Sequence, residues 1–99
     1  MARFDVYRNS VGEGFLLEVQ ADLLSHLNTR VVVPLLPSGG ELQPARGLNP
    51  VFEIEGSRFV MATQFLATVP SSLLKAPVAR LGAFRAEITT ALDMLFQGF

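Results

Sequence analysis

Apolar and polar residues alternate with a period of two along the first part of the chain. In residues 3–9 this pattern places Phe4 and Val6 on one side of a predicted strand and Asp5 and Tyr7 on the other. We therefore expect a half-buried strand whose polar side faces solvent. Tyr7, on that side, is predicted to lie at the rim of the fold or of a dimer contact.

Two further strands are predicted before residue 37. Residues 10–14 contain two glycines and read as the turn into a strand over residues 15–20, which is partly apolar on both sides. A connector follows over residues 21–28, and residues 30–36 then form a nearly continuous apolar run, typical of a strand covered on both sides. Pro34 within that run is expected at a bulge or an edge.

The middle of the chain combines a long loop with a hairpin. Residues 37–50 contain glycines and prolines that break any regular period, which predicts a loop. Residues 51–55 and 58–63 alternate on either side of Gly56 and Ser57. Glycine at the first position of that pair predicts a type II′ hairpin turn.

The last third of the chain is predicted to end in a helix. Residues 64–75 are expected to add one or two short strands around Pro70, and Pro77 marks the approach to the helix. Helical periodicity begins at Leu81, but Gly82 is a weak cap and no capping box follows. Tertiary packing must therefore hold this helix.

This order of elements predicts one α+β domain over residues 1–99. Five to seven short, mostly antiparallel strands precede a single helix that lies on or across the sheet. A small open barrel is the architecture that this order favours. The 99 residues contain no internal repeat and no linker long enough to separate a second domain.

The apolar positions of the helix form one stripe. At about 100° per residue they fall within an arc of roughly 140° that continues to the last residue, and they occupy positions 81, 84, 88, 91, 92, 95, 96 and 99. Arg85 lies inside this arc, so it must reach the rim or pair across an interface. The arc is expected to be a binding face, which covers this chain's own sheet, a second copy or a foreign protein.

Composition favours self-association. The hydrophobic fraction is 49% and the charged fraction is 17%, against about 25% charged residues in typical soluble domains. More apolar surface is therefore present than one small core hides, and a homodimer is expected. The net charge of −1, with no run of basic residues, argues against direct binding of nucleic acid.

The sequence contains few residues that could support catalysis or bind a cofactor. The chain has no cysteine and a single histidine, His26, beside Ser25, and adjacent side chains rarely form a productive dyad. A metal site would need a carboxylate cluster, whereas Glu53 and Glu55 read as a solvated strand side. The glycine pairs do not form a phosphate-binding loop, so no cofactor is predicted. No segment is apolar enough to span a membrane and no signal pattern is present, so we expect a cytoplasmic protein.

Several motifs together resemble one protein family, in matching order and spacing over almost the whole chain. They are Phe4-x-Val6-Tyr7, Val19-Gln20-x-Asp22-Leu23-Leu24, Thr29-Arg30-x-Val32-Val33-Pro34-Leu35, Leu48-Asn49-Pro50-Val51-Phe52, Met61-x-Thr63, Val69-Pro70 and Leu95-Phe96-x-Gly98-Phe99. The chain resembles the CcdB-type toxins of bacterial toxin–antitoxin pairs, which are small dimeric proteins that poison DNA gyrase. The resemblance implies an SH3-like open barrel with a smaller second sheet and one C-terminal helix.

The resemblance also implies a non-catalytic function and a set of contact residues. The expected partners are a second copy, the gyrase A subunit, whose cleaved-DNA complex is trapped, and an antitoxin whose disordered tail folds onto the toxin. The implied gyrase-binding residues are Gln97, Gly98, Phe99, Arg85, Thr90 and Asp93, and the implied dimer interface is Ile88, Leu92, Leu95 and Phe96.

The sequence departs from the family pattern at two of these positions. The family has a tryptophan where Gln97 stands and a glutamate where Arg85 stands, so either Phe99 takes over the aromatic role or the target is a divergent gyrase. Two alternatives stay open. One is a degenerate member that folds and binds antitoxin without poisoning gyrase, and the other is a MazF-like endoribonuclease that would use Arg30, Arg58 and His26.

Overall fold

Seven short strands and one α-helix make up the computed structural model, which describes residues 2–40 and 42–98. The strands are β1 (Asp5–Arg8), β2 (Phe15–Glu18), β3 (Thr29–Pro37), β4 (Val51–Ile54), β5 (Ser57–Met61), β6 (Ala67–Pro70) and β7 (Ala79–Arg80). The helix α1 spans Arg85–Gln97, and short 3₁₀ helices occur at η1 (Asp22–Leu24), η2 (Thr63–Phe65), η3 (Ser71–Leu73) and η4 (Gly82–Phe84). None of the described helices is long and apolar enough to cross a membrane.

β3 is the strand around which the antiparallel sheet is built. The strand order is β4-β5-β3-β2-β1-β7, and β6 also pairs with β3. Both β5 and β6 pair with β3, β6 with residues 29–32 and β5 with residues 35–37. Between them the amide of Ala62 donates to the carbonyl of Pro34 at 2.9 Å. Pro34 therefore lies in a central strand, opposite Leu16 of β2 and at the gap between β6 and β5, and not at an edge of the sheet.

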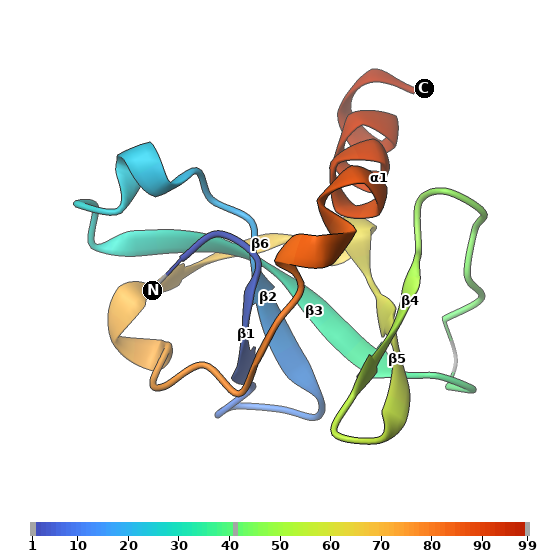
Figure 1. Ribbon diagram of the computed structural model, residues 1–99, viewed down its shortest axis with the longest axis horizontal. Helices are drawn as coiled ribbons and strands as arrows, with labels where there is room; N and C mark the ends of the chain where they lie inside the picture. Colours follow the sequence, from blue (N-terminus) through green and yellow to red (C-terminus); the bar gives the residue numbers. More distant parts are fainter. Residues whose placement is uncertain (1, 41, 99) are drawn as a thin grey trace.

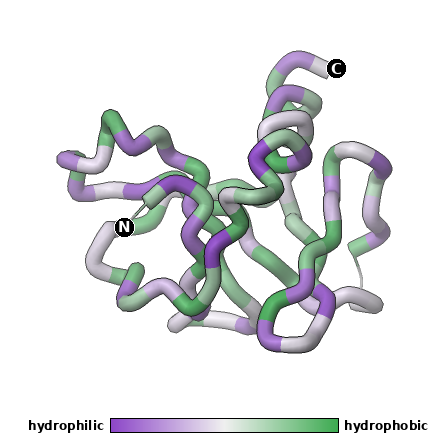
Figure 2. The backbone as a smooth tube through the Cα atoms, viewed as in Figure 1, coloured by the Kyte–Doolittle hydropathy of each residue, from purple (hydrophilic) through white to green (hydrophobic). Residues whose placement is uncertain are grey.

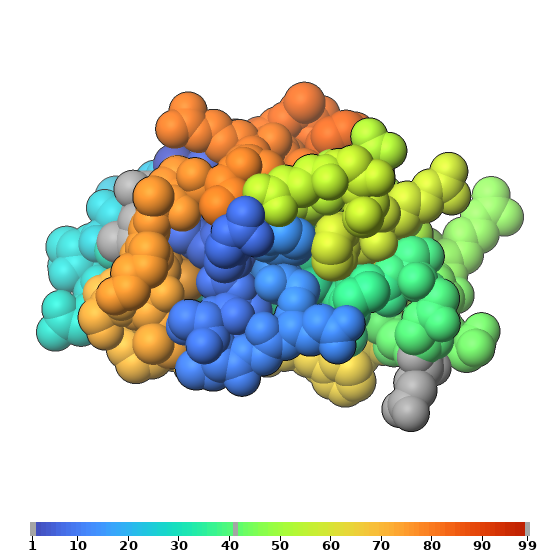
Figure 3. Space-filling model, turned by 90° about the horizontal axis from the view of Figure 1, so that it is seen from below, coloured from blue at the N-terminus to red at the C-terminus, as the bar shows by residue number. Residues whose placement is uncertain are grey.

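The sheet curls into an open barrel. The main strand order ends at β4 and β7, and the centre of the Phe84 ring, just before α1, lies 5.2 Å from the centre of the Phe52 ring of β4. Figure 3 shows the orange segment that leads into α1 beside the lime hairpin of β4 and β5. Figure 1 shows α1 standing on the barrel at the end where this segment enters it. The predicted SH3-like open barrel of the α+β class is confirmed.

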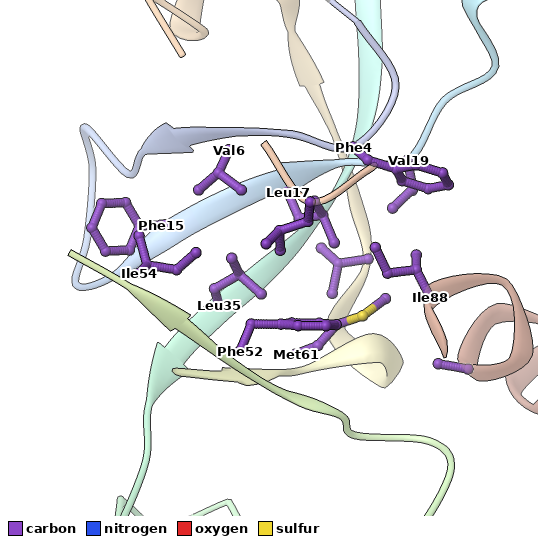
Figure 4. Packing of buried hydrophobic residues seen from close by; sticks show 13 residues of the cluster. Phe4, Val6, Phe15, Leu17, Val19, Leu35, Phe52, Ile54, Met61 and Ile88 are labelled. Atoms are coloured by element: carbon purple, nitrogen blue, oxygen red, sulfur yellow. The ribbon is translucent and has the colours of Figure 1, made fainter. Parts of the chain in front are cut away.

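The barrel interior holds the main apolar core. Side chains from β1, β2, β3, β4, β5 and α1 meet there, as Figure 4 shows for Leu17, Leu35, Met61 and Ile88. Ile88 has no exposed surface. The assignment of Ile88 to the dimer interface is therefore corrected, because its side chain fills this chain's own core and reaches no partner.

β1 is covered on both sides. Tyr7 is fully buried and Asp5 is 4% exposed, although both stand on the side that the alternation predicts to be polar and solvated. Tyr7 packs with Leu16, Val32 and Leu74 in a second apolar cluster. The prediction of Tyr7 as a rim residue is wrong, because the segment after β6 folds back over this side of the sheet.

The hairpin of β4 and β5 is present, but its turn lies one residue earlier than predicted. Ile54 pairs with Ser57, so the two-residue turn is Glu55-Gly56. Glu55 has φ 51° and Gly56 has φ 83°. Two positive φ values define a type I′ turn in place of the predicted type II′ turn.

The long loop after β3 has no strand among its described residues, as predicted. Its end is held by Asn49, which is 4% exposed and donates to the carbonyl of Met61 at 2.9 Å and to Oε1 of Gln64 at 2.8 Å. The predicted absence of a strong helix cap is also confirmed. Phe84 precedes α1 and offers no side-chain cap.

Candidate protein-binding face

One side of α1 borders an open apolar groove. Leu92 is half-buried against the core, whereas Phe96, one turn later, is 69% exposed. The groove has a volume of about 640 Å³. We call it the α1 groove, and its lining residues are Val19, Gln20, Ala21, Leu24, Val31, Leu66, Ala67, Thr68, Leu92 and Phe96.

The connector before β3 extends this apolar surface. Leu24 lines the α1 groove, and its neighbour Leu23 is 86% exposed. Figure 2 shows hydrophobic stretches in this connector and along α1. From the sequence we expected no function for Leu23 and Leu24. Two adjacent leucines outside any predicted strand are the signal that could have identified them.

The described end of α1 is held by a glycine cap. Gly98 adopts φ 82° and its amide donates to the carbonyl of Met94 at 3.0 Å. This left-handed conformation ends the helix without a side-chain clash. Gln97 and Gly98 are both exposed. Phe99, which was predicted to bind gyrase, lies outside the described residues.

The other predicted gyrase contacts are exposed residues of α1. Arg85 lies in its first turn, and its guanidinium carbon is 5.2 Å from the centre of the Phe4 ring. Thr90 and Asp93 are three residues apart and therefore neighbours on one side of the helix. Thr90 also lines a shallow hollow beside Gly47 of the long loop.

The predicted dimer side chains lie at different depths. Leu92 and Leu95 are half-buried and Phe96 is exposed, so these three keep surface that a partner can cover. With Ile88 in the core, a contact through this side of the helix rests on them and on the lining of the α1 groove.

A buried polar cluster anchors the connector. Arg30 is 3% exposed and donates to the carbonyls of Ser25 at 2.5 Å, Thr29 at 2.8 Å and Leu27. Nearby, the amide of Gln20 donates to the carbonyl of Leu24 at 3.1 Å. The connector that carries the exposed leucines is thus tied to buried side chains.

Glu18 provides the negative charge of this cluster. Its Oε2 lies 3.5 Å from Nε of Arg30, and its Oε1 accepts a hydrogen bond from the Tyr7 hydroxyl at 3.2 Å. Burial raises the pKa of Glu18 above its ordinary value, against the opposing effects of Tyr7 and Arg30. Burial and the nearby carboxylates of Glu18 and Asp5 also raise the pKa of Tyr7.

The side chains proposed for RNA cleavage do not converge. Arg30 is buried and committed to backbone carbonyls, whereas His26 and Arg58 are exposed. His26 belongs to the connector and Arg58 to β5, and Figure 1 shows these two segments at opposite ends of the molecule. The described residues contain no cluster of three or more carboxylate or histidine side chains suited to a metal ion.

Comparison with known proteins gives one family match. The model of the CcdB protein family matches residues 3–98. No curated protein sequence matches the chain.

Several solved structures share the fold. An endoribonuclease in complex with its cognate antitoxin from a mycobacterial species is similar at 18% identity and a TM-score of 0.76, over 97% of this chain and 94% of that one. The Mycobacterium tuberculosis toxin MazF-mt6 is similar at 13% identity and a TM-score of 0.73, over 93% of this chain and 95% of that one. At these identities the likeness concerns the fold alone.

Proposed function

The chain belongs to the CcdB family, and from this premise we propose that it is a non-catalytic toxin that acts as a homodimer on the gyrase A subunit. Family membership makes it a toxin of a toxin–antitoxin system. The family match over residues 3–98 is the observation that carries the proposal. In this proposal the toxin traps gyrase on cleaved DNA in the cytoplasm, and an antitoxin with a disordered tail neutralises it.

The proposed dimer is supported by the α1 groove. Leu92, Leu95 and Phe96 contribute exposed apolar surface beside a groove that is itself lined mainly by apolar residues. A twofold contact uses the same patch on both copies, so the α1 groove of each copy covers that of the other. The exposed aromatic ring of Phe96 is the kind of side chain that anchors such contacts.

The proposed gyrase contact lies at the end of α1. Gln97 is the last residue of α1 and Gly98 is its cap. We assign these two, Phe99, and the helix residues Arg85, Thr90 and Asp93 to this contact. Leu23 of the connector joins this set, because it is almost fully exposed next to a lining residue of the α1 groove. Contacts between proteins concentrate their binding energy in a few such side chains.

A gyrase assay with the purified protein tests this function. We expect inhibition of supercoiling and accumulation of cleaved DNA at micromolar toxin, and we expect deletion of residues 97–99 to abolish both. Val11→Ala is the control, because Val11 is 79% exposed and neither it nor its neighbours in the chain line the α1 groove. No inhibition by the intact protein, with antitoxin binding retained, would identify the degenerate family member instead.

The ribonuclease alternative receives no independent support beyond the shared fold. Arg30 is buried, and His26 and Arg58 lie on separate segments. Incubation of the same preparation with cellular RNA tests this alternative directly. Cleavage that survives a further purification step would overturn the non-catalytic proposal.

A further inference from the structure

Two arginines flank one buried aromatic ring beside the start of α1. The guanidinium carbons of Arg3 and Arg85 lie 4.7 and 5.2 Å from the centre of the Phe4 ring. Phe4 itself is 1% exposed. Its backbone is held at φ 73°, with its amide donating to the carbonyl of Glu18 and its carbonyl accepting from the amide of Leu81. The ring therefore gives both arginines a fixed base.

Neither of these guanidinium groups has a carboxylate partner among the described residues. Three other arginines do have one, since Arg8 lies 2.8 Å from Glu55, Arg30 3.5 Å from Glu18 and Arg80 3.6 Å from Asp5. The only hydrogen bond of the Arg3 guanidinium in the described part of the chain runs from Nε to the carbonyl of Val19 at 3.3 Å.

Asp22 is close to Arg3 but does not neutralise it. Its Oδ1 accepts from the backbone amide of Arg3 at 2.8 Å, and no ion pair forms between the two side chains. The outer N–H groups of both guanidiniums thus keep their capacity to bind an anion.

Helix stability does not explain Arg85. It is the first residue of α1, where the positive end of the helix dipole disfavours a cation. Stacking on Phe4 offsets part of that cost, since a cation–π contact is worth about 0.5–1 kcal/mol at exposed sites, but it does not require a second arginine on the same ring.

We propose that Arg3 and Arg85 form a docking point for a carboxylate side chain of a partner protein. The planar fork of a guanidinium matches a carboxylate in a bidentate arrangement. This inference rests on the proposed function, because Arg85 belongs to the proposed gyrase contact. The partner segment therefore carries an acidic residue that reaches the two guanidiniums.

A nucleic-acid phosphate is the less favoured ligand for this pair. The chain has a net charge of −1. Two carboxylates are also near in the structure or the chain, because Asp22 accepts a hydrogen bond from the Arg3 amide and Glu87 lies in the first turn of α1 with Arg85. A polyanion gains little from two cations in such surroundings, whereas a single carboxylate needs only these two.

Selection from a phage-displayed random 16-residue peptide library tests the proposal. The wild type is compared with Arg3→Gln/Arg85→Gln and with Arg46→Gln/Arg58→Gln, a control that removes the same charge from two exposed arginines elsewhere. We expect acidic residues to be enriched in peptides selected by the wild type and the control. We also expect the best of these peptides to bind the first double variant about tenfold more weakly.

Three results would overturn the proposal. The first is a set of selected peptides without acidic enrichment, and the second is equal peptide binding by the wild type and the Arg3→Gln/Arg85→Gln variant at matched melting temperature. The third is binding of an oligouridylate probe that depends on the same arginines. If the glutamine variant does not fold, Arg3→Lys/Arg85→Lys keeps the charge but removes the planar fork, and the proposal then requires it to bind the selected acidic peptides more weakly than the wild type.

The gyrase assay separates this inference from the proposed function. If the Arg3→Gln/Arg85→Gln variant inhibits gyrase as strongly as the wild type, the two arginines do not dock gyrase, and the proposed function still stands. Acidic selection by a wild type that fails to inhibit gyrase would overturn gyrase as the target and support the docking point.

Discussion

Glu18 of β2 and Arg30 of β3 form an ion pair inside the protein, with Oε2 and Nε 3.5 Å apart and both side chains almost fully buried. The Nε atom of Arg30 has no hydrogen-bond partner in the described part of the chain. The rest of the guanidinium holds the carbonyls of the connector. The pair therefore links the sheet to the segment that exposes Leu23.

Removal of Arg30 should destabilise the fold. We expect Arg30→Gln to lower the free energy of unfolding by about 3–5 kcal/mol, because Glu18 is left as an uncompensated buried charge. Urea denaturation measures this loss. Hydrogen exchange should also show faster exchange in the connector. Arg58→Gln, which changes an exposed arginine, is the control, and an equally small effect of both variants would contradict the anchoring role.

The stability of the protein should depend on pH through Glu18. Because burial raises its pKa above 4.5, the folded state holds this proton more tightly than the unfolded state does. Ionisation of Glu18 therefore costs stability as the pH rises from about 4.5 through the raised pKa. Relative to Glu18→Gln, which does not titrate, the wild type should gain stability as the pH falls through the raised pKa toward about 4.5.

Tyr7→Phe provides the control for this pH effect. The Tyr7 hydroxyl lowers the pKa of Glu18 by its hydrogen bond to the carboxylate. Its removal should therefore move the pH-dependent window upward. A difference between the wild type and Glu18→Gln that is independent of pH would show that this assignment is wrong.

Two substitutions on α1 should separate folding from dimerisation. Ile88→Asp should unfold the protein, because it places a charge in the core where Ile88 has no exposed surface. Phe96→Asp should leave the melting temperature nearly unchanged, because Phe96 is 69% exposed. It should weaken the proposed dimer by about 2 kcal/mol or more. Sedimentation velocity and thermal melting of both variants give the two readouts.

Leu23 should matter for gyrase and not for folding. We expect Leu23→Asp to change the free energy of unfolding by no more than about 0.5 kcal/mol, because the side chain is 86% exposed. The same variant should reduce gyrase inhibition. Val11→Asp is the matched control, since Val11 is 79% exposed in the β1–β2 turn. Equal inhibition by both variants would remove Leu23 from the proposed contact.

The type I′ turn should be open to improvement. Glu55 has φ 51°, a region that asparagine tolerates better than glutamate. Relative to Glu55→Gln, which also lacks the carboxylate, Glu55→Asn should raise the free energy of unfolding by about 0.5–1 kcal/mol. Glu55→Gln isolates the loss of the exposed ion pair with Arg8, which is worth at most about 1 kcal/mol. A Glu55→Asn variant that melts below Glu55→Gln would contradict the turn assignment.

Local pattern was sufficient for the elements and for the class of fold. The alternation around Phe4, the glycine of the β4–β5 hairpin and the helical period after Leu81 each depend on residues close in sequence. The predicted strands, the long loop and the single helix therefore agree with the structure. The position of the hairpin turn was predicted one residue too late, because Glu55 adopts a positive φ that glycine tolerates more readily.

The order of residues alone was enough to predict an antiparallel barrel with an apolar closing helix, and it carries the motifs of the family. The burial of Tyr7, the place of Ile88 in the core and the contact of Arg3 and Arg85 with one ring of Phe4 depend on how distant segments pack. Periodicity states which residues face the same way, but not what covers them. The covering groups come from strands and loops far along the chain, and burial of a polar side chain is tolerated only where such a group supplies its partner.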